Sequence, residues 1–152
     1  MRYESFALER LRDILHLGLA MHKEGDYQSV PFDIEKTAQA IMDLIIKDEN
    51  GFGVIAYDGD KPVGILAGGI TQPFFSYSTY AFDYVWYIVP EHRGARTAIR
   101  MLKMFKEWAT EKGCEDLWMG VSTNIQPEKT GKLFERLGFR HVGGNYKVKL
   151  NG

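Results

Sequence analysis

The sequence predicts an α/β (or α+β) domain in which a mixed sheet carries helices on both faces. Three observations predict this class. Apolar residues recur at helical spacing in two N-terminal segments, β-rich runs follow from residue 52 to residue 89, and helical segments alternate with short strands from residue 97 onward. The early strands are joined by short turns and the later ones through helices. We therefore expect antiparallel hairpins first and crossover connections afterwards.

The two N-terminal segments are predicted to be amphipathic helices. A stripe of leucines at helical spacing runs through residues 8–19, and Gly25 follows its polar end. Asp33 is a suitable N-cap for a second helix, which Asn50 and Gly51 end. Between the two helices, "GDYQSVPF" is a polar, proline-containing segment and is expected to be a surface loop.

The middle of the chain is predicted to form three strands. "FGVIAY" and "VGILAGGIT" are β-rich, and the Asp58-Gly59 pair between them suits a hairpin turn. In "STYAFDYVWYIV" the side chains should alternate between the two faces of the sheet, unless a bulge shifts the phase. The loop before it, "TQPFFSYS", carries aromatic residues and is a candidate wall of a ligand pocket.

The C-terminal third alternates between helix and strand. A helical stripe begins at Thr97 and ends at Gly113, a short strand "DLWMGV" follows, and Pro127 can open a further helix that Gly138 closes. The tail "FRHVGGNYKVKL" is expected to add one or two strands, with a kink or turn at its paired glycines.

Composition restricts the class of protein. With 152 residues, 45% of them hydrophobic, the chain is expected to be a single domain over residues 1–152. A formal net charge of −1 gives no indication of a nucleic-acid or membrane partner. No signal peptide or spanning segment is seen, and the single cysteine, Cys114, excludes an internal disulfide and is expected to be a structural thiol. These features favour a cytoplasmic protein.

The segment "VPEHRGARTAIRMLK", residues 89–103, is the strongest candidate for chemistry. It predicts the end of a strand, a tight turn and the start of a helix, where unpaired N–H groups and the helix dipole form an anion site. Small residues in the turn would let a pyrophosphate approach the backbone, while Arg93 and Arg96 add positive charge. An ordinary basic turn is the alternative interpretation.

This turn resembles motif A of the GNAT superfamily, the acetyl-CoA-dependent N-acyltransferases. That motif, Arg/Gln-x-x-Gly-x-Gly/Ala, corresponds here to residues 93–98, with Arg96 in place of the central glycine. The phrases "YIVPEHRG", "AIRMLKMFKEWATEKG", "DLWMGV" and "LFERLGFRHVGG" follow in the family's order over nearly the whole chain. The resemblance implies a GNAT fold with a mostly antiparallel mixed sheet of about six strands, flanked by about four helices. It also implies transfer of an acetyl group from acetyl-CoA to a primary amine.

The resemblance assigns acetyl-CoA to two segments. Backbone groups of the fourth strand would meet the acetyl and pantetheine part, and amides at the helix start would hold the pyrophosphate. The Arg96 side chain either adds a phosphate contact or is a solvated surface arginine. The implied cofactor-binding residues are Trp86, Tyr87, Ile88, Arg93, Gly94, Ala95, Arg96, Thr97, Ala98, Ile99 and Asn124.

The catalytic end departs from the family pattern. The tyrosine that commonly protonates the departing CoA thiolate is Phe134 here, which has no proton to donate. Another group, of which Tyr146 is one candidate, acts as the acid, or water does, or the thiolate leaves unassisted. For the base, Asp83 is the acidic residue of the strand that enters the loop. Its alternative role is a structural carboxylate held by backbone donors or an arginine.

Several function classes stay open at this stage. The main one is an N-acetyltransferase that works by direct attack in a ternary complex, without a metal, with a homodimer expected from family habit. A non-catalytic GNAT module that binds CoA or a protein is the alternative. A nucleotide-phosphate binder unrelated to CoA would require a Gly-Lys-Ser/Thr motif, which the sequence lacks. The fold leaves the acceptor amine undefined.

Overall fold

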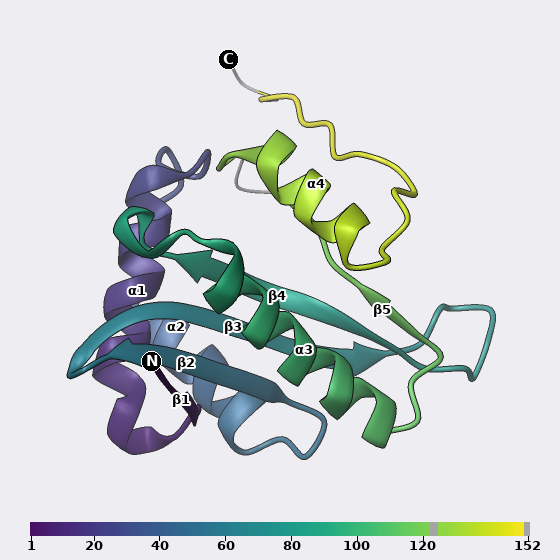
Figure 1. Ribbon diagram of the computed structural model, residues 1–152, viewed down its shortest axis with the longest axis horizontal. Helices are drawn as coiled ribbons and strands as arrows, with labels where there is room; N and C mark the ends of the chain where they lie inside the picture. Colours follow the sequence, from purple (N-terminus) through teal and green to yellow (C-terminus); the bar gives the residue numbers. More distant parts are fainter. Residues whose placement is uncertain (122–124, 151–152) are drawn as a thin grey trace.

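The computed structural model describes residues 1–121 and 125–150 and contains a five-stranded sheet (Figure 1). The strands lie in the order β1-β2-β3-β4-β5; the first four pair antiparallel, and β4 pairs with β5 in parallel. They are β1 (Arg2–Ser5), β2 (Phe52–Asp58), β3 (Lys61–Thr71), β4 (Tyr80–Ile88) and β5 (Asp116–Trp118). The predicted mixed, mostly antiparallel sheet is confirmed.

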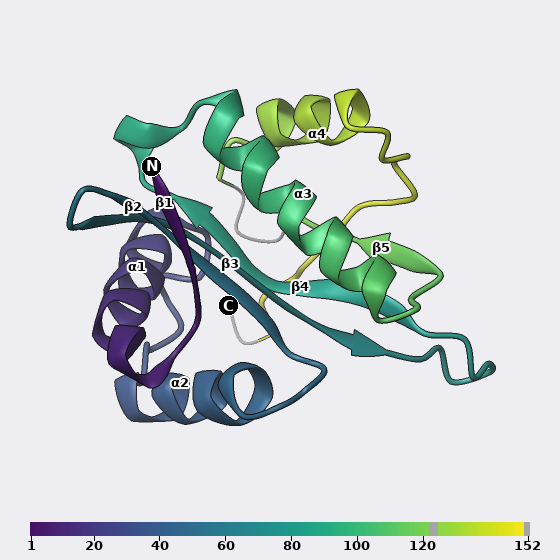
Figure 2. The same ribbon diagram turned by 60° about the horizontal axis from the view of Figure 1, so that its bottom comes forward.

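Helices cover both faces of this sheet. Figure 2 shows α1 and α2 on one side and α3 and α4 on the other. None of the helices in the described part of the chain is long and apolar enough to cross a membrane. The α-helices are α1 (Leu11–Glu24), α2 (Ile34–Ile41), α3 (Ala95–Glu111) and α4 (Pro127–Arg136), and the shorter helical segments are η1 (Leu8–Arg10), η2 (Met42–Ile46) and η3 (Pro90–His92).

The helix boundaries follow the expected capping chemistry. The Asp33 side chain accepts a hydrogen bond of 2.9 Å from the Lys36 N–H, which caps the first turn of α2. Gly113 after α3 and Gly138 after α4 have φ values of 77° and 91°, which glycine adopts without strain. The predicted start of α2 and the predicted ends of α3 and α4 are therefore confirmed, whereas the second helical segment ends at Ile46, before the expected stop at Asn50 and Gly51.

Each face of the sheet has its own apolar core. Met101, Phe105 and Phe134 belong to the core between the sheet and the pair α3 and α4. Ile14 and Leu17 belong to the core between the sheet and α1. Because β3 is covered on both faces, its run of apolar residues is nearly continuous rather than alternating.

A β-bulge interrupts the pairing of β3 with β4. Gly68 pairs with Asp83 and Ala67 pairs with Val85, so Tyr84 is an extra residue on β4. The sequence allowed for such a shift of phase in this strand. The bulge lies where the side chain of a candidate catalytic residue, Asp83, meets the sheet.

The bulge reverses the alternation of side chains along β4. Ala81 and Trp86 both pack in the core under α3 and α4, although strict alternation would place them on opposite faces. Val85 and Tyr87 pack in the other core, under α1. Before the bulge the odd-numbered residue Ala81 faces the core under α3 and α4, and after the bulge the even-numbered residue Trp86 faces that core.

One strand was not predicted, and one expected strand is absent from the described residues. The strand that was not predicted is β1, which pairs with β2 through Tyr3 and Ala56 and carries charged residues at alternate positions. The tail, residues 139–150, contains no strand in the structure, because none of the described segments runs beside it as a ladder partner. The sheet consequently has five strands in the described chain, where about six were expected.

Candidate active site

The strands β4 and β5 run together for three residue pairs and then separate. The last pair joins Phe82 to Trp118. Just beyond it, the Gly120 N–H donates a hydrogen bond of 3.2 Å to Asp83 Oδ1. A cavity of about 690 Å³ lies from this point onward, lined by β4 up to Ile88, by the start of α3 and by one face of α4. Where two strands separate, backbone N–H and C=O groups become available to a ligand.

The predicted cofactor strand lies on this cavity. Trp86, Tyr87 and Ile88 all line it, as the resemblance implied. The Trp86 ring lies 5.4 Å from the Phe134 ring of α4, measured between centroids. Its Nε1 is a buried donor without a hydrogen-bond partner among the described residues. The indole therefore forms the apolar side of the cavity that faces α4.

The turn after β4 brings the start of α3 to the same cavity. Gly94 is the N-cap residue of α3, and no side chain caps the first turn. Gly94 and Ala98 line the cavity. Uncapped N–H groups at a helix start, together with the helix dipole, attract anions. The binding of a phosphate by this helix start stays a prediction.

The arginine that replaces the motif's central glycine fits without backbone strain. Arg96 lies in the first turn of α3 with an exposed side chain. Among the described residues other than glycine, Gln126 is the one with a positive φ, so Arg96 keeps an ordinary helical backbone. The phosphate contacts expected of Arg96 and of its helical neighbours Ala95, Thr97 and Ile99 stay predictions.

Arg93, the first residue of the motif, forms hydrogen bonds and an ion pair with other residues of the protein. Its Nε donates to the Ile88 carbonyl at 2.8 Å, and its two terminal nitrogens lie 2.7 and 2.8 Å from the two carboxylate oxygens of Glu24 in α1. The Tyr87 hydroxyl donates to the same carboxylate at 2.8 Å. The hydrogen bond from Arg93 holds the pKa of Glu24 below its usual value, against the opposing effect of burial. This network joins the end of α1 to the cofactor turn.

Glu24→Gln should lower the free energy of unfolding by about 1–2 kcal/mol at pH 7, because it leaves the half-buried guanidinium of Arg93 without its charge partner. The depressed pKa of Glu24 stabilises the fold above pH 4.5, and this contribution is lost as the pH falls through the folded-state pKa. The difference in the free energy of unfolding between the variant and the wild type should therefore become smaller at acidic pH. Urea unfolding at several pH values measures it.

Glu9→Gln is the matched control, since Glu9 is exposed and pairs with Arg10 at 3.8 Å. This change should alter the free energy of unfolding by less than about 0.5 kcal/mol. If Glu24→Gln were as mild as this control at pH 7, the network would not be what joins α1 to the turn.

Asp83 occupies the closed end of the split between β4 and β5. Its side chain is half-buried and lines the cavity. Burial raises the pKa of Asp83 to about 6, and the hydrogen bond from the Gly120 N–H opposes this effect. At neutral pH the group is thus a carboxylate whose proton affinity is well above that of an ordinary aspartate. This is the property required of a general base.

No side chain with a proton to donate stands at the position of the family's usual acid. Phe134 is buried in the core, with its ring centroid 5.3 Å from that of Phe139. Tyr146 is 97% exposed on the C-terminal tail and does not line the cavity. Its role as acid stays a prediction, while the strand expected to carry it is absent. Asn124, the remaining candidate for a cofactor contact, lies outside the described residues.

A basic face of α4 was missed in the sequence. Lys129, Lys132 and Arg136 line the cavity together with neighbouring residues of the helix. Their spacing of three and four residues places them on one face of a helix, and this signal was available. The cavity is also lined by Met21 of α1 and Tyr27 of the loop after it. Nothing in the sequence indicated that these two residues belong to the site. A polyanionic ligand would therefore meet positive charge from α4 as well as from the turn.

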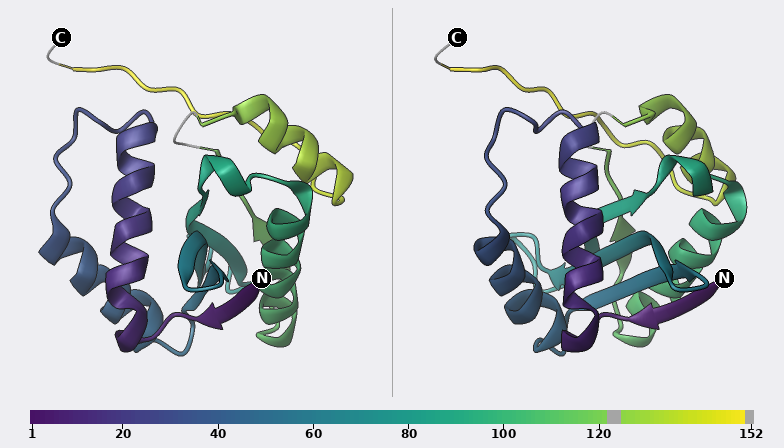
Figure 3. Two further views of the ribbon diagram at one scale, coloured as in Figure 1. Left: turned by 60° about the vertical axis from the view of Figure 1, so that its left-hand side comes forward. Right: turned by 90° about the vertical axis from the view of Figure 1, so that its left-hand side faces the viewer.

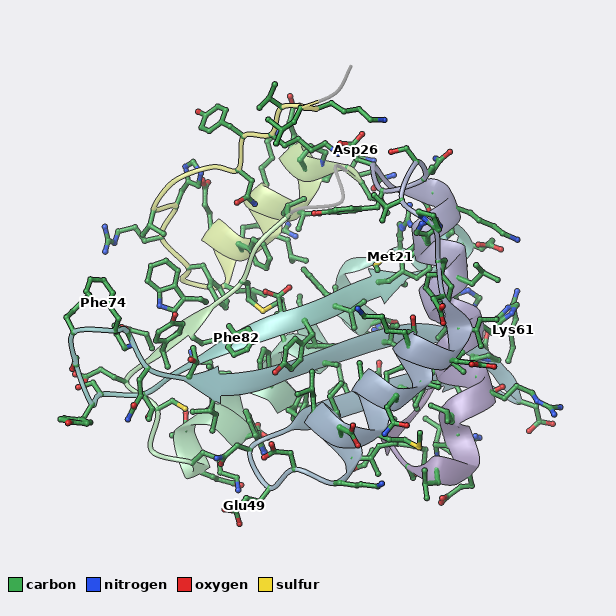
Figure 4. All side chains as sticks on the ribbon, turned by 180° about the vertical axis from the view of Figure 1, so that it is seen from behind. Met21, Asp26, Glu49, Lys61, Phe74 and Phe82 are labelled. Atoms are coloured by element: carbon green, nitrogen blue, oxygen red, sulfur yellow. The ribbon has the colours of Figure 1, made fainter. Side chains whose placement is uncertain are left out.

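The aromatic loop "TQPFFSYS" does not line this cavity, so its proposed role as a pocket wall is wrong. It connects β3 to β4 at the end of the sheet remote from the start of α3. Figure 4 labels Phe74 in this loop at one end of the molecule, with Met21 and Asp26 at the other. The cavity begins at Asp83, after the first part of β4, and the loop precedes that strand.

Comparisons with known proteins identify the family and the fold. Residues 13–139 match the model of the acetyltransferase (GNAT) family, which is more than half of the 152 residues. No curated protein sequence matches the chain.

Solved structures share the fold over nearly the whole chain. The aminoglycoside 6'-N-acetyltransferase AAC(6')-Ih from Acinetobacter baumannii has a TM-score of 0.76 at 18% identity, covering 99% of this chain and 97% of that one. AAC(6')-Iy, in complex with the bisubstrate analogue CoA-S-monomethyl-acetylneamine, has a TM-score of 0.76 at 16% identity, covering 99% and 98%. A transcriptional regulator from Bacillus halodurans C-125 has a TM-score of 0.72 at 21% identity, covering 98% and 99%. The family model, together with this shared fold, shows that the chain belongs to the acetyltransferase (GNAT) family.

Proposed function

We propose that this protein transfers the acetyl group of acetyl-CoA to a primary amine by direct attack within a ternary complex. The observation that carries this proposal is the position of Asp83 at the closed end of the split between β4 and β5. The cavity that starts there reaches the uncapped start of α3, so one continuous space joins a basic carboxylate to an anion site.

The residues around the cavity suit the parts of acetyl-CoA. Its pyrophosphate would lie at the start of α3, near the basic face of α4, and its pantetheine arm would extend along β4 towards Asp83. The family model and the CoA-containing analogue bound by AAC(6')-Iy support acetyl-CoA as the ligand. Trp86, Tyr87 and Ile88 would then flank the thioester end of the arm.

The chemistry needs one base and no covalent enzyme intermediate. The amine nitrogen forms a bond to the thioester carbonyl carbon, and the carbon–sulfur bond breaks, leaving its electron pair on sulfur. Asp83 takes the proton from the attacking amine, directly or through a water molecule. Phe134 has no proton to donate, so the thiolate leaves unassisted or takes a proton from water or from another group, of which Tyr146 is the candidate. Positioning and a backbone N–H to the carbonyl oxygen supply the remaining acceleration.

Acetyl-CoA should raise the melting temperature of the protein. At 100 times its dissociation constant it would stabilise the fold by about 2.7 kcal/mol, which is several degrees for a chain of this size. Release of free CoA would then be measured against a panel of primary amines. Aminoglycosides belong in that panel, since AAC(6')-Ih acetylates this class by its name. Absence of a shift would contradict the proposal.

A CoA-binding protein without turnover is the second candidate, and Phe134 at the position of the usual proton donor favours it. The same experiment separates the two functions. A thermal shift with acetyl-CoA, but without CoA release on any amine of the panel, would indicate the binding function. Neither function requires an acidic side chain in place of the missing tyrosine.

A further inference from the structure

The first half of β4 and the strand β5 carry aromatic side chains that lie outside both apolar cores. These are Tyr80, Phe82 and Tyr84 of β4 and Trp118 of β5. Ala81 packs under α3 and α4, so its neighbours Tyr80 and Phe82 face the opposite side of the sheet. Trp118 lies on that side as well, since its ring centroid is 5.8 Å from that of Tyr80. We call these four residues the aromatic face.

The rings of the aromatic face pack on one another and on the sheet. The Phe82 and Tyr84 rings meet edge to face, with centroids 4.9 Å apart. A Cβ atom at Gly69 of β3 would lie 3.0 Å from the Tyr84 hydroxyl oxygen, so the glycine leaves room for this ring against the sheet. Tyr84 is nevertheless 45% exposed and Trp118 is 49% exposed. The face is therefore ordered by its own contacts and still accessible to a ligand.

In the described chain, the helices α1 and α2 leave this face open. The core under α1 takes Val85 and Tyr87 from β4, and both lie after the bulge. Figure 3 shows α1 and α2 on the same side of the sheet, and Figure 4 shows Phe82 on the part of β4 that neither helix crosses. The face is continuous with the cavity, because Tyr84 lines the cavity beside Asp83. An amine that approaches Asp83 from this side would lie on aromatic rings.

Negative charge gathers at this end of the site. Asp116 points to the same side of the sheet as Trp118, which follows it by two residues on β5. Burial raises the pKa of Tyr84, and the nearby charge of Asp48, in the loop before β2, raises it further. Neither Asp48 nor Asp116 forms an ion pair with a described residue. The cations that line the cavity belong instead to α4 and to the turn before α3, at its other end.

We infer that the acceptor is a polycationic amine, whose reacting nitrogen lies at Asp83 while a second positive charge lies over the aromatic face. This inference rests on the proposed acetyl transfer and names the class of its acceptor. An ammonium group is attracted to the face of an indole or phenol ring, and most strongly to an indole. The carboxylates of Asp48 and Asp116 add Coulomb attraction for the charges beyond the reacting amine. A monoamine would leave these groups unused.

Calorimetric titration of amines into the protein, with and without CoA, tests this inference independently of turnover. Spermidine should bind at least about 10-fold more tightly than 1-aminobutane, which carries one charge. Trp118→Leu keeps an apolar side chain but removes the ring, so it should raise the dissociation constant of spermidine about 5-fold. Asp116→Asn should raise it about 2-fold or more. Both variants should retain the thermal shift with acetyl-CoA.

Phe74→Leu is the matched control, because it removes an exposed ring from the loop before β4 and should leave the affinity for spermidine unchanged. Equal affinities for spermidine and 1-aminobutane would overturn the polycationic class. Tighter binding of 2-phenylethylamine than of spermidine would also overturn it, and would show that the face selects an apolar ring. An effect of Trp118→Leu no larger than that of Phe74→Leu would remove the aromatic face from the acceptor site. Selective binding of spermidine without release of CoA would contradict the proposed acetyl transfer and support the cation site.

Discussion

Asp83→Asn is expected to lower kcat/KM for the amine by about 100-fold or more at pH 7, since a positioned general base contributes at least this factor. In the wild type, kcat/KM should rise as the pH increases through about 6, where burial places the pKa of Asp83. Below that pH the carboxyl group is protonated and cannot accept the proton of the amine. The variant should lack this inflection, while a titration that belongs to the amine itself would remain in both.

The stability of this variant provides a control on its activity. The folded-state pKa of Asp83 is raised above its ordinary value of 3.8, so the charged form is disfavoured by folding and the penalty is present above pH 6. Asparagine removes that charge and can still accept from the Gly120 N–H. Asp83→Asn should therefore be at least as stable as the wild type at pH 7, and its affinity for acetyl-CoA should be unchanged.

Asp60→Asn, on the exposed turn between β2 and β3, is the matched control for the loss of one carboxylate. It should retain wild-type turnover at every pH. Equal pH profiles for Asp83→Asn and the wild type would remove Asp83 from the chemistry and leave it as a structural carboxylate.

Phe105→Ala should have the largest effect on stability, a loss of about 3–5 kcal/mol in the free energy of unfolding. Phe105 of α3 is 0% exposed and its ring stacks on that of Phe52, with centroids 4.8 Å apart. A Cβ atom at Gly68 would overlap the Phe105 ring, so β3 and the phenyl group fit closely. A close-packed site of this kind does not collapse around a smaller side chain, and a cavity would remain.

Phe74→Ala is the control of identical chemistry, because Phe74 is fully exposed in the loop between β3 and β4. It should change the free energy of unfolding by no more than about 0.5 kcal/mol. Urea unfolding followed by circular dichroism measures both variants. A loss below about 1 kcal/mol for Phe105→Ala would show that the core under α3 is not close-packed there.

The fold was predictable where local chemistry determines it. The capping residue Asp33 and the terminating glycines Gly113 and Gly138 act within one turn of the helices that they bound, so the sequence predicts those boundaries. β1 could not be predicted, since it has four residues of which only Tyr3 packs against a core, and its pairing with β2 spans about fifty residues. The tail shows the opposite case: residues 139–150 have a strand-like pattern but form no strand among the described residues.

The candidate site was predictable in part. The turn at residues 93–98 follows from the family phrases, and the structure places its ends on the cavity with β4. The ion pair between Arg93 and Glu24 could not be predicted, because the two residues are 69 positions apart in the sequence. The basic residues of α4 recur at helical spacing, so their common face could have been predicted. Tyr27 reaches the cavity through tertiary packing alone, which the sequence does not show.

The bulge at Tyr84 also bears on how this protein can vary in length. Because the bulge absorbs the extra residue, a β4 without Tyr84 would alternate regularly and send the same side chains to each core, whereas one further residue between Ala81 and Trp86 would exchange the two sets. The loop at residues 72–79 lies outside both cores and carries no such constraint. Insertions and deletions among homologues should therefore accumulate in that loop, and the one length change expected in β4 is the loss of its bulge residue.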